Sequence, residues 1–531
     1  MSAFAGTGEL VRMALRRDRI LLPVWLILLV TIAAGTAEST ISLYKTPGPR
    51  IQAAQNINHT LALVALDGRI YDVRSAGAIA MVKMSGFGVI LVAILAIVLV
   101  IRHTRAEEET GRLELVGSAV VGRRAPLTAA LLVAAGASIV LGVVTALALI
   151  GTKLPVGGSL AFGTAWAGAG LAFAAVAAVA AQVVGSGRTA SATAYTALGV
   201  CYVLRAIGDT ASATGPRWLS WLSPVGWEQQ VRAYAGNRWP VLLITLAFTV
   251  VVTAGSYVLV AHRDLGSALV PDRPGPAAGA SSLRSPLVLA WHLQRGALLG
   301  WTAGLGVLGL VIGSIASTSG SFLNTRGSRE IVLRLGGQKG LTDAFLSAEL
   351  GVLGVIVSAY GIQAAMRLRS EEASERAEPV LATGTSRISW ALSHFVIAIA
   401  GSAVILAVCG VTAGLMYGGR AGDVSRAGGV IAGALVQLPA VWVFTGIVLL
   451  AFGLAPRLIV AGWAALAACV LLGELGPILK LKQWVTDVSP YAHVPRLPGS
   501  SLQPASLIVL TALAAALAAA GLAGFRRRDI G

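Results

Sequence analysis

The sequence predicts an all-α polytopic membrane protein with about twelve transmembrane helices in two parallel six-helix repeats. Three observations predict this class. The mean hydropathy of the 531-residue chain is +0.78 and only 12% of its residues are charged, which is more apolar than soluble proteins are. Apolar runs long enough to cross a bilayer recur along the chain. A set of polar landmarks also occurs twice in the same order.

Each apolar run is long enough to cross the hydrocarbon core, which takes about 20 residues. In the first half the runs fall near 20–38, 80–101, 125–151, 158–184, 189–207 and 240–261, and in the second near 297–316, 348–366, 388–416, 428–453, 458–478 and 503–525. We interpret the first run as a retained span. It is long for the apolar region of a signal peptide, and its counterpart in the second half lies in mid-chain.

The charge distribution predicts the orientation. With the N-terminus inside, the inner segments hold 22 of the 41 Lys and Arg residues, and most outer ones lie in long segments, which count less than short loops. Twelve spans then put both termini in the cytoplasm. Heavy use of Ala, Gly, Val and Arg suggests a GC-rich bacterium, so the expected location is the bacterial cytoplasmic membrane. The net charge of +17 suits membrane lipids rather than nucleic acid, because the basic residues lie in short runs between spans.

A Pro-, Gly-, Ser- and Ala-rich stretch at 267–286 predicts a cytoplasmic linker. It separates a first permease half at 1–266 from a second at 287–531. Polar landmarks recur in the two halves with an offset near 264. The first-half members are Arg105, Glu107, Glu108, Arg112, Glu114, Val116 and Arg123, and their counterparts are Arg369, Glu371, Glu372, Arg376, Glu378, Val380 and Arg387. Polar residues in register indicate an internal repeat.

Two acidic segments, residues 105–116 (RAEEETGRLELV) and 369–380 (RSEEASERAEPV), hold 8 of the 24 acidic residues. Each follows the second span of its half. The first predicts a helix to about Thr110 and a turn at Gly111. In the second, Glu375 replaces Gly111 and Pro379 follows, which predicts a slightly later break. A solvated loop is the alternative, but a loop repeated in register favours a docking element.

These segments resemble the cytoplasmic loop of ABC-2 type permeases, the membrane subunits of type V ABC exporters. The matching strings are E-E-E-T-G-R-L-E-L-V…V-V-G-R and E-P-V-L-A-T-G-T-S-R at 378–387. WLSPVGW at 221–227 and DVSPYAH at 487–493 are similar to the family's Ser-Pro element before the last span. The family has a proline where Val120 and Gly384 stand. The resemblance covers both halves and is strongest to fused permeases for actinobacterial polyketide antibiotics (the tetronasin type) and for mycobacterial multidrug efflux.

The resemblance implies a permease without catalytic residues, driven by two copies of a separate ATPase subunit that bind ATP and Mg. The chain has no G-x-x-x-x-G-K-[ST] motif, and GGQKG at 336–340 lacks the following Ser or Thr. The acidic segments would be the coupling loops, with Arg105, Glu107, Glu108, Arg112 and Glu114 in the first and Arg369, Glu371, Glu372, Arg376 and Glu378 in the second. The resemblance also implies that 9–19 is a connecting helix in the inner interface. Spans rich in Ala, Val, Leu and Gly indicate a lipophilic or amphipathic cargo.

Four charged residues near the outer ends of spans form a candidate outer gate: Lys83, Arg205, Glu349 and Glu474. Charges in spans are costly and therefore point to function. Arg205 and Glu474 are nearly repeat-equivalent, so we expect them to pair across the halves when the gate is closed. The alternative is an i,i+4 pair of Arg205 with Asp209 on its own helix.

Two other classes stay open. A proton-coupled secondary transporter can also have twelve helices in two halves, but it needs embedded acids, and only Glu349 and Glu474 come close. A membrane-bound transferase needs a polar loop with clustered Asp or His, which the sequence lacks. The six histidines and three cysteines show no metal-ligand spacing, so we expect no metal site.

Overall fold

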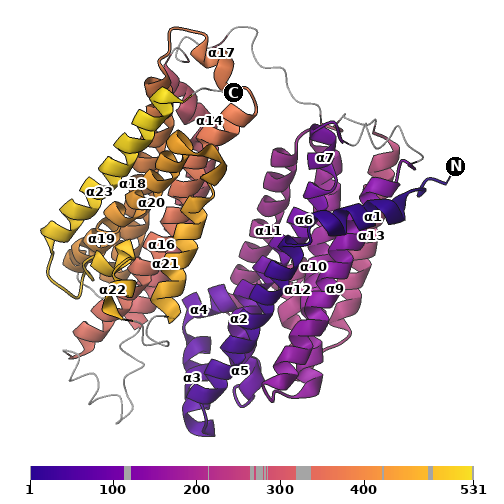
Figure 1. The fold of residues 1–531 in the computed structure, drawn as a ribbon. Coiled ribbons are helices and arrows are strands. Elements are labelled where there is room, and N and C mark those ends of the chain that lie inside the picture. Colours follow the sequence, from indigo (N-terminus) through magenta and orange to yellow (C-terminus); the bar gives the residue numbers. More distant parts are fainter. Residues whose placement is uncertain are drawn as a thin grey trace. The chain divides into compact units, whose positions relative to one another are not determined.

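The computed structural model confirms the predicted all-α membrane class. It describes residues 2–112, 121–212, 214–263, 268–270, 279, 283, 285–318, 337–420, 424–475 and 482–528, and within these it contains helices and no strand. The chain divides into two compact units, unit 1 at Met1–Gly275 and unit 2 at Pro276–Gly531. The division falls inside the stretch predicted as a linker. Figure 1 shows each unit as a bundle of long helices.

Unit 1 contains the membrane-spanning helices of the first half and several shorter helices at their ends. Its elements are α1 (Thr7–Arg17), α2 (Leu21–Leu43), α3 (Pro47–His59), α4 (Leu61–Asp67), α5 (Ala76–Lys83), the π-helical turn η1 (Met84–Gly88), α6 (Val89–Arg102), α7 (Arg105–Glu109), α9 (Ala125–Gly151), α10 (Val156–Val183), α11 (Gly187–Thr210), the 3-10 helix η2 (Arg217–Leu222), α12 (Pro224–Gln230) and α13 (Val241–Ala261).

Unit 2 repeats this plan. Its elements are α14 (Pro286–Thr318), α16 (Gly337–Ala373), α17 (Ala377–Leu381), α18 (Arg387–Arg420), the 3-10 helix η5 (Val424–Arg426), α19 (Ala427–Leu435), α20 (Leu438–Leu454), the 3-10 helix η6 (Pro456–Leu458), α21 (Ala461–Leu475), α22 (Gln483–Thr486), the 3-10 helix η7 (Pro490–His493) and α23 (Pro504–Arg527).

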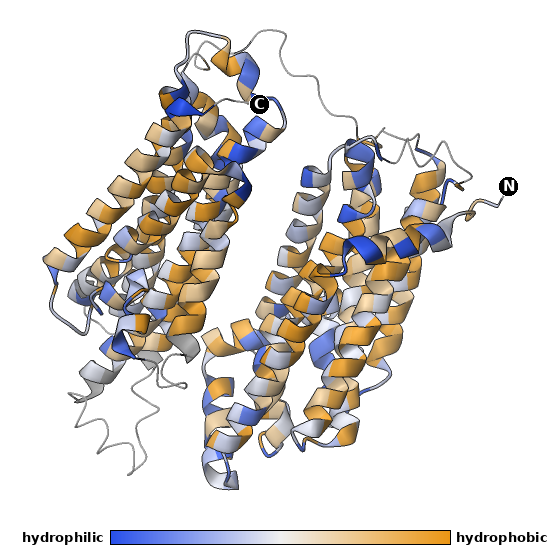
Figure 2. Cartoon of the chain, viewed as in Figure 1, coloured by the Kyte–Doolittle hydropathy of each residue, from blue (hydrophilic) through white to orange (hydrophobic). Residues whose placement is uncertain are grey.

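Eleven helices among the described residues are long and apolar enough to cross a membrane. They account for eleven of the twelve predicted spans. The run at 458–478 gives a shorter apolar stretch, Pro456–Leu472, so its length does not reach that of the others. Most helices extend past the apolar runs that predicted them, because their ends add polar residues that lie beyond a hydrocarbon core. Figure 2 shows hydrophobic residues along the helices and hydrophilic ones gathered at their ends.

Small residues set the tightest helix contacts in each unit. In unit 1, a Cβ added to Gly163 of α10 would lie 2.2 Å from the carbonyl oxygen of Gly142 on α9. In unit 2, a Cβ added to Gly453 of α20 would lie 1.9 Å from the carbonyl oxygen of Gly521 on α23. Glycine is therefore required at these crossings, as in membrane bundles where backbones pack directly together.

We call the end of each unit that carries an acidic segment its acidic end, and the opposite end its far end. In unit 1, α7 and the N-terminal helix α1 lie at the acidic end, and α3 lies at the far end, with α4 between α3 and the middle of the bundle (Figure 1). In unit 2, α17 lies at the acidic end and α22 at the far end (Figure 1).

Candidate functional site

The first acidic segment is held by a buried ion-pair cluster. Arg105 pairs with Glu108 one turn later on α7, and Arg263, which follows α13, pairs with the other oxygen of the same carboxylate. The Glu108 side chain is only 10% exposed. Arg105 also donates through Nε to the carbonyl of Val184 at 2.8 Å, and this contact satisfies the end of α10. The segment is thereby fixed to the ends of two spans.

The second acidic segment is held by the same arrangement. Arg369 donates to Glu372 at 3.0 Å, and Arg528, just after α23, pairs with the other oxygen. The Glu372 side chain is 6% exposed. The repeat detected in the sequence is therefore also a repeat of contacts, since each cluster joins the acidic segment to an arginine that follows the last helix of its unit.

A third arginine completes each cluster. Arg123 donates to the backbone carbonyl of Arg263 in unit 1, and Arg387 donates to that of Arg528 in unit 2 at 2.8 Å. Arg123 stands just before the third span of unit 1, and Arg387 is the first residue of the third span of unit 2. The backbone that follows the last span is thus tied to the entrance of the third span on one side and to the acidic segment on the other.

Both acidic segments turn at the same register. Gly111 has φ +70°, and the repeat-equivalent Glu375 has φ +58° although it is not glycine. The N–H of Glu375 bonds to Glu372 O and that of Arg376 to Glu371 O, both at 3.0 Å, which is a Schellman C-cap. The later break predicted for the second segment is therefore wrong, because a left-handed residue ends the helix before Pro379 can.

The predicted coupling residues divide into buried and exposed groups. Glu371 is buried and pairs with Arg367 at 2.6 Å. Glu107 is partly buried and contacts Arg112 at 4.0 Å. Arg112, Arg376 and Glu378 are exposed. Glu114 lies outside the described residues. Their coupling role stays a prediction, but only the exposed members could contact another protein directly without rearrangement.

The N-terminal helix α1 is attached to the first acidic segment. Arg17 at its end pairs with Glu107. The adjacent Asp18 is fully buried and contacts Arg102 at 3.1 Å and His103 at 2.5 Å. A cavity of about 190 Å³ lies between α1, the acidic segment and α9. The amphipathic helix predicted at 9–19 exists, and these contacts make it part of the acidic end.

Sequence reasoning missed several members of this site. Arg263 and Arg528 are not among the predicted coupling residues, because their pairs with the acidic segments span 155 and 156 residues of chain. Asp18 and His103 are likewise absent from the predicted site residues. The signal available in the sequence was the recurrence of an arginine after the last span of each half.

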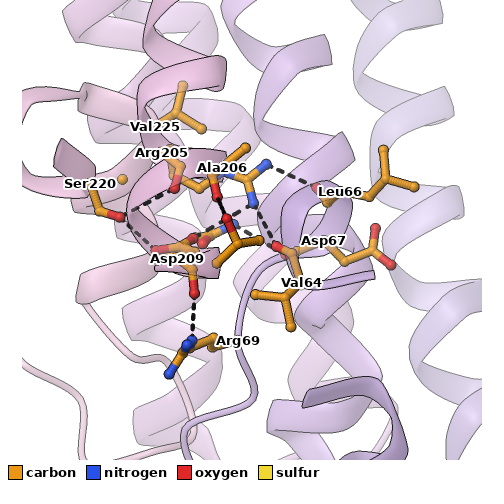
Figure 3. A network of polar contacts seen from close by, with 12 residues as sticks. Val64, Leu66, Asp67, Arg69, Arg205, Ala206, Asp209, Ser220 and Val225 are labelled. Atoms are coloured by element: carbon orange, nitrogen blue, oxygen red, sulfur yellow. Dashed lines mark hydrogen bonds and ion pairs between the residues drawn. The ribbon is translucent and has the colours of Figure 1, made fainter. Parts of the chain in front are cut away.

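Figure 3 shows the surroundings of Arg205 at the far end of unit 1. This side chain is fully buried. It donates to the carbonyls of Val64 at 3.3 Å and Leu66 at 2.9 Å, at the C-terminal end of α4. It also lies 3.7 Å from the carboxylate of Asp209. Cations are favourable at helix C-termini, so Arg205 anchors α4 to α11.

The other members of the predicted outer gate are less defined. Lys83 is exposed at the end of α5, and Glu349 is half-buried in α16. The side chain of Glu474 lies outside the described residues. The contact with Asp209 favours the alternative in which Arg205 pairs on its own helix. A pair between Arg205 and Glu474 stays a prediction.

The helices and the paired acidic ends define a multi-pass membrane protein built from two related units. A family model described as "Multidrug efflux system permease Rv1217c, C-terminal domain" matches residues 10–259 and 283–526. The chain is also 44% identical over 532 residues to the multidrug efflux system permease protein Rv1217c of Mycobacterium tuberculosis (strain ATCC 25618 / H37Rv), with 100% of this chain and 96% of the relative covered. The chain therefore belongs to this permease family, which confirms the resemblance to mycobacterial multidrug efflux permeases.

Proposed function

We propose that this chain is the permease subunit of an ATP-driven ABC exporter of the ABC-2 type, with the type V fold, and that it exports lipophilic or amphipathic compounds. Its cargo class would include drugs and polyketide antibiotics of the tetronasin type. The chain itself would not be an enzyme. Two copies of a separate ATPase subunit would bind ATP and Mg and would drive the transport cycle.

The observation that carries this proposal is the pair of equivalent clusters at the acidic ends. In each, a buried glutamate holds a short charged element against the ends of the spans, and exposed residues such as Arg112 in unit 1 and Arg376 in unit 2 remain at the surface. A partner that pushed on this element would transmit force to the last span directly, because Arg263 and Arg528 follow the last helices. Two such elements per chain support two ATPase copies.

In this proposal the acidic ends face the cytoplasm and both termini lie there, in a bacterial cytoplasmic membrane. The basic residues at these ends, such as Arg526 and Arg527, suit the anionic headgroups of the inner leaflet. The far ends, with α3 and α22, would face outward.

Purification of the tagged chain from its native cells tests the proposal. We expect an ATPase subunit to co-purify, and the mass of the complex to correspond to one chain and two ATPase subunits. The complex in proteoliposomes should hydrolyse ATP faster when a lipophilic cargo is added. An active particle without an ATPase, or one with a single ATPase copy, would contradict the proposal.

A proton-coupled secondary transporter is the second candidate, and one observation favours it. Glu228 on α12 is an acid that is only 5% exposed. Cargo uptake into inverted vesicles separates the two candidates. Uptake that needs ATP and persists without a pH gradient supports the ABC exporter, whereas uptake driven by a pH gradient alone supports the proton-coupled one.

A further inference from the structure

The Ser-Pro element of unit 1 places a carboxylic acid inside the far end. Ser223 caps α12, and its hydroxyl accepts hydrogen bonds from the N–H groups of Val225 at 3.2 Å and Gly226 at 3.3 Å. Pro224 occupies the first turn, where its missing N–H has no cost. The short helix is thereby fixed, and it packs against α10, α11, α13 and η1. Glu228, its fifth residue, points away from solvent and is 5% exposed.

Among the described residues, the carboxyl group of Glu228 is poorly supplied with polar partners. Ser85 of η1 lines the same cavity and favours the ionised carboxylate, and the Oε2 atom of Glu228 has no hydrogen-bond partner among the described residues. Of the positive side chains around it, Arg205 is already engaged with Val64 and Leu66. Arg232 lies 4.1 Å over the ring of Tyr71. An ionised Glu228 would therefore be a poorly compensated buried charge.

Asp67 of α4 and Arg69 of the following loop line the same cavity as Glu228. The other elements around α12 carry Lys83 at the end of α5, Asp209 of α11 and Arg217 of η2. Arg69 donates to the carbonyls of Asp209 and Ala211. Its guanidinium therefore already interacts with the C-terminal end of α11. Burial of the group raises the pKa of Glu228 well above its ordinary value of 4.5, against the smaller effects of Ser85 and Arg205.

A polar cavity adjoins Glu228. Its volume is about 30 Å³, which exceeds the roughly 10–15 Å³ that one water molecule needs. Its walls include Asp67, Tyr71, Ser85, Gln229 and Arg232. Gln229 Oε1 is a second buried oxygen without a hydrogen-bond partner among the described residues. The cavity thus offers acceptors for a water molecule beside the acid.

Gln229 connects this cavity to a span. Its side-chain amide donates to Asp67 O at 3.1 Å and to Ser85 O at 3.3 Å. Ser85 lies in the π-helical turn Met84–Gly88 that interrupts the span formed by α5 and α6. Single π-helical turns inside α-helices occur frequently at functional sites. A change of charge on Glu228 therefore acts at a place where the span is already irregular.

We propose that the far end of unit 1 contains a proton-binding site, in which Glu228 carries a proton that exchanges with water in the adjoining polar cavity. Loss of this proton would place a negative charge beside the π-helical turn and would draw water or a cationic side chain toward it. The site makes the conformation of the first half depend on the pH at the far end. This inference does not require an ATPase.

Infrared difference spectroscopy of the full purified chain in lipid tests the site. The variant is Glu228→Gln, and the matched control is Glu38→Gln, which changes an exposed glutamate on α2. We expect the spectrum at neutral pH to contain a carbonyl band of a protonated carboxylic acid that Glu228→Gln removes and Glu38→Gln retains. A band unaffected by Glu228→Gln would overturn the proposal.

A second variant keeps the test decisive if Glu228→Gln does not fold. Ser85→Ala removes the hydroxyl that favours the ionised carboxylate, so the protonated band should persist to higher pH than in the unchanged chain. Disappearance of the band at the same pH in both would contradict the assignment to Glu228.

Transport measurements separate this site from the proposed energy source. If Glu228 binds a proton, Glu228→Gln should flatten the dependence of cargo transport on far-side pH, and Glu38→Gln should leave it unchanged. An unaltered pH profile in Glu228→Gln would overturn the role of the site. Cargo transport that needs neither ATP nor a co-purifying ATPase would instead contradict the exporter proposal and leave the infrared result intact.

Discussion

Arg528 closes the acidic end of unit 2 by pairing with the carboxylate of Glu372, a residue 156 positions earlier in the chain. Its guanidinium also lies over the rings of Phe452 at 5.1 Å and Phe525 at 5.5 Å. The contact therefore combines an ion pair with cation–π packing at the end of α23. Arg263 and Glu108 form the equivalent pair in unit 1, which makes this relationship a property of the repeat.

Arg528→Ala should loosen the acidic end of unit 2. It leaves a buried oxygen of Glu372 without its donor, and hydrogen bonds to charged groups contribute about 1.5–3 kcal/mol. We expect a lower thermal unfolding midpoint. Tryptophan fluorescence of the purified chain measures this midpoint. Arg527→Ala is the matched control, because Arg527 is exposed on the same turn. Equal midpoints for the two variants would mean that the pair with Glu372 does not stabilise the unit.

Glu375→Gly should stabilise unit 2. Glu375 has φ +58°, and a left-handed conformation costs an ordinary L-residue about 1–2 kcal/mol. Part of this gain is offset by the greater freedom of glycine in the unfolded chain, so the net gain should be about 1 kcal/mol. Glu378→Gly, within α17, should instead destabilise by about 1 kcal/mol. The same sign for both variants would show that backbone strain at Glu375 is unimportant.

Exposed and buried residues of the acidic segments should have different phenotypes. Charge reversal at exposed Arg376 and Glu378 should weaken ATPase binding, by about 30-fold for a loss of about 2 kcal/mol, and should leave the unfolding midpoint unchanged. Glu372→Gln should reduce both ATPase binding and the unfolding midpoint. Glu38→Lys, at the far end, should change neither. The measurement is co-purified ATPase per chain together with the midpoint.

The double replacements test the coupling loops themselves. Replacing both Glu108 and Glu114, or both Glu372 and Glu378, should abolish cargo-stimulated ATP hydrolysis while the chain still purifies as a folded protein. Normal transport in both double variants would show that the acidic segments are not the coupling loops.

The fold was largely predictable from the sequence because membrane helices are long and apolar. The run predicted at 125–151 has the same bounds as α9. The contacts that hold the acidic ends were not predictable in the same way, since Arg263 and Glu108 are brought together only by the packing of whole helices. Glu228 was missed for another reason. It lies on the seven-residue helix α12, and a search for spans of about 20 residues does not reach such an element.

Variants of Arg205 test whether this side chain only anchors α4 to α11 or also forms part of the outer gate. Arg205→Gln should destabilise unit 1 by about 3 kcal/mol, because it leaves Asp209 as a buried charge without its partner. If Arg205 is also a gate residue, the swap Arg205→Glu with Glu474→Arg should restore the transport that each single change removes. Transport should stay lost after the swap if Arg205 acts only by anchoring α4. Cargo efflux and the unfolding midpoint of each variant provide the two readouts.

The protonation of Glu228 also predicts how stability depends on pH. Burial raises the pKa of this group in the folded chain above its ordinary value of 4.5, so above that pH the folded state holds a proton that the unfolded state has released. Stability must then fall as the pH rises through this window, until the folded group also loses its proton. Glu228→Gln cannot ionise, and it should therefore lose this part of the pH dependence.

The measurement is the unfolding midpoint of the full chain from pH 5 to 9, a range chosen to lie above the ordinary pKa of a carboxyl group. Relative to the unchanged chain, Glu228→Gln should gain stability as the pH rises, and Glu38→Gln should follow the unchanged chain throughout. A Glu228→Gln curve parallel to that of the unchanged chain would show that Glu228 has the same protonation in the folded and unfolded states. An ionised Glu228 would then need a compensating cation, and Arg205 and Arg232 would be the side chains to replace next.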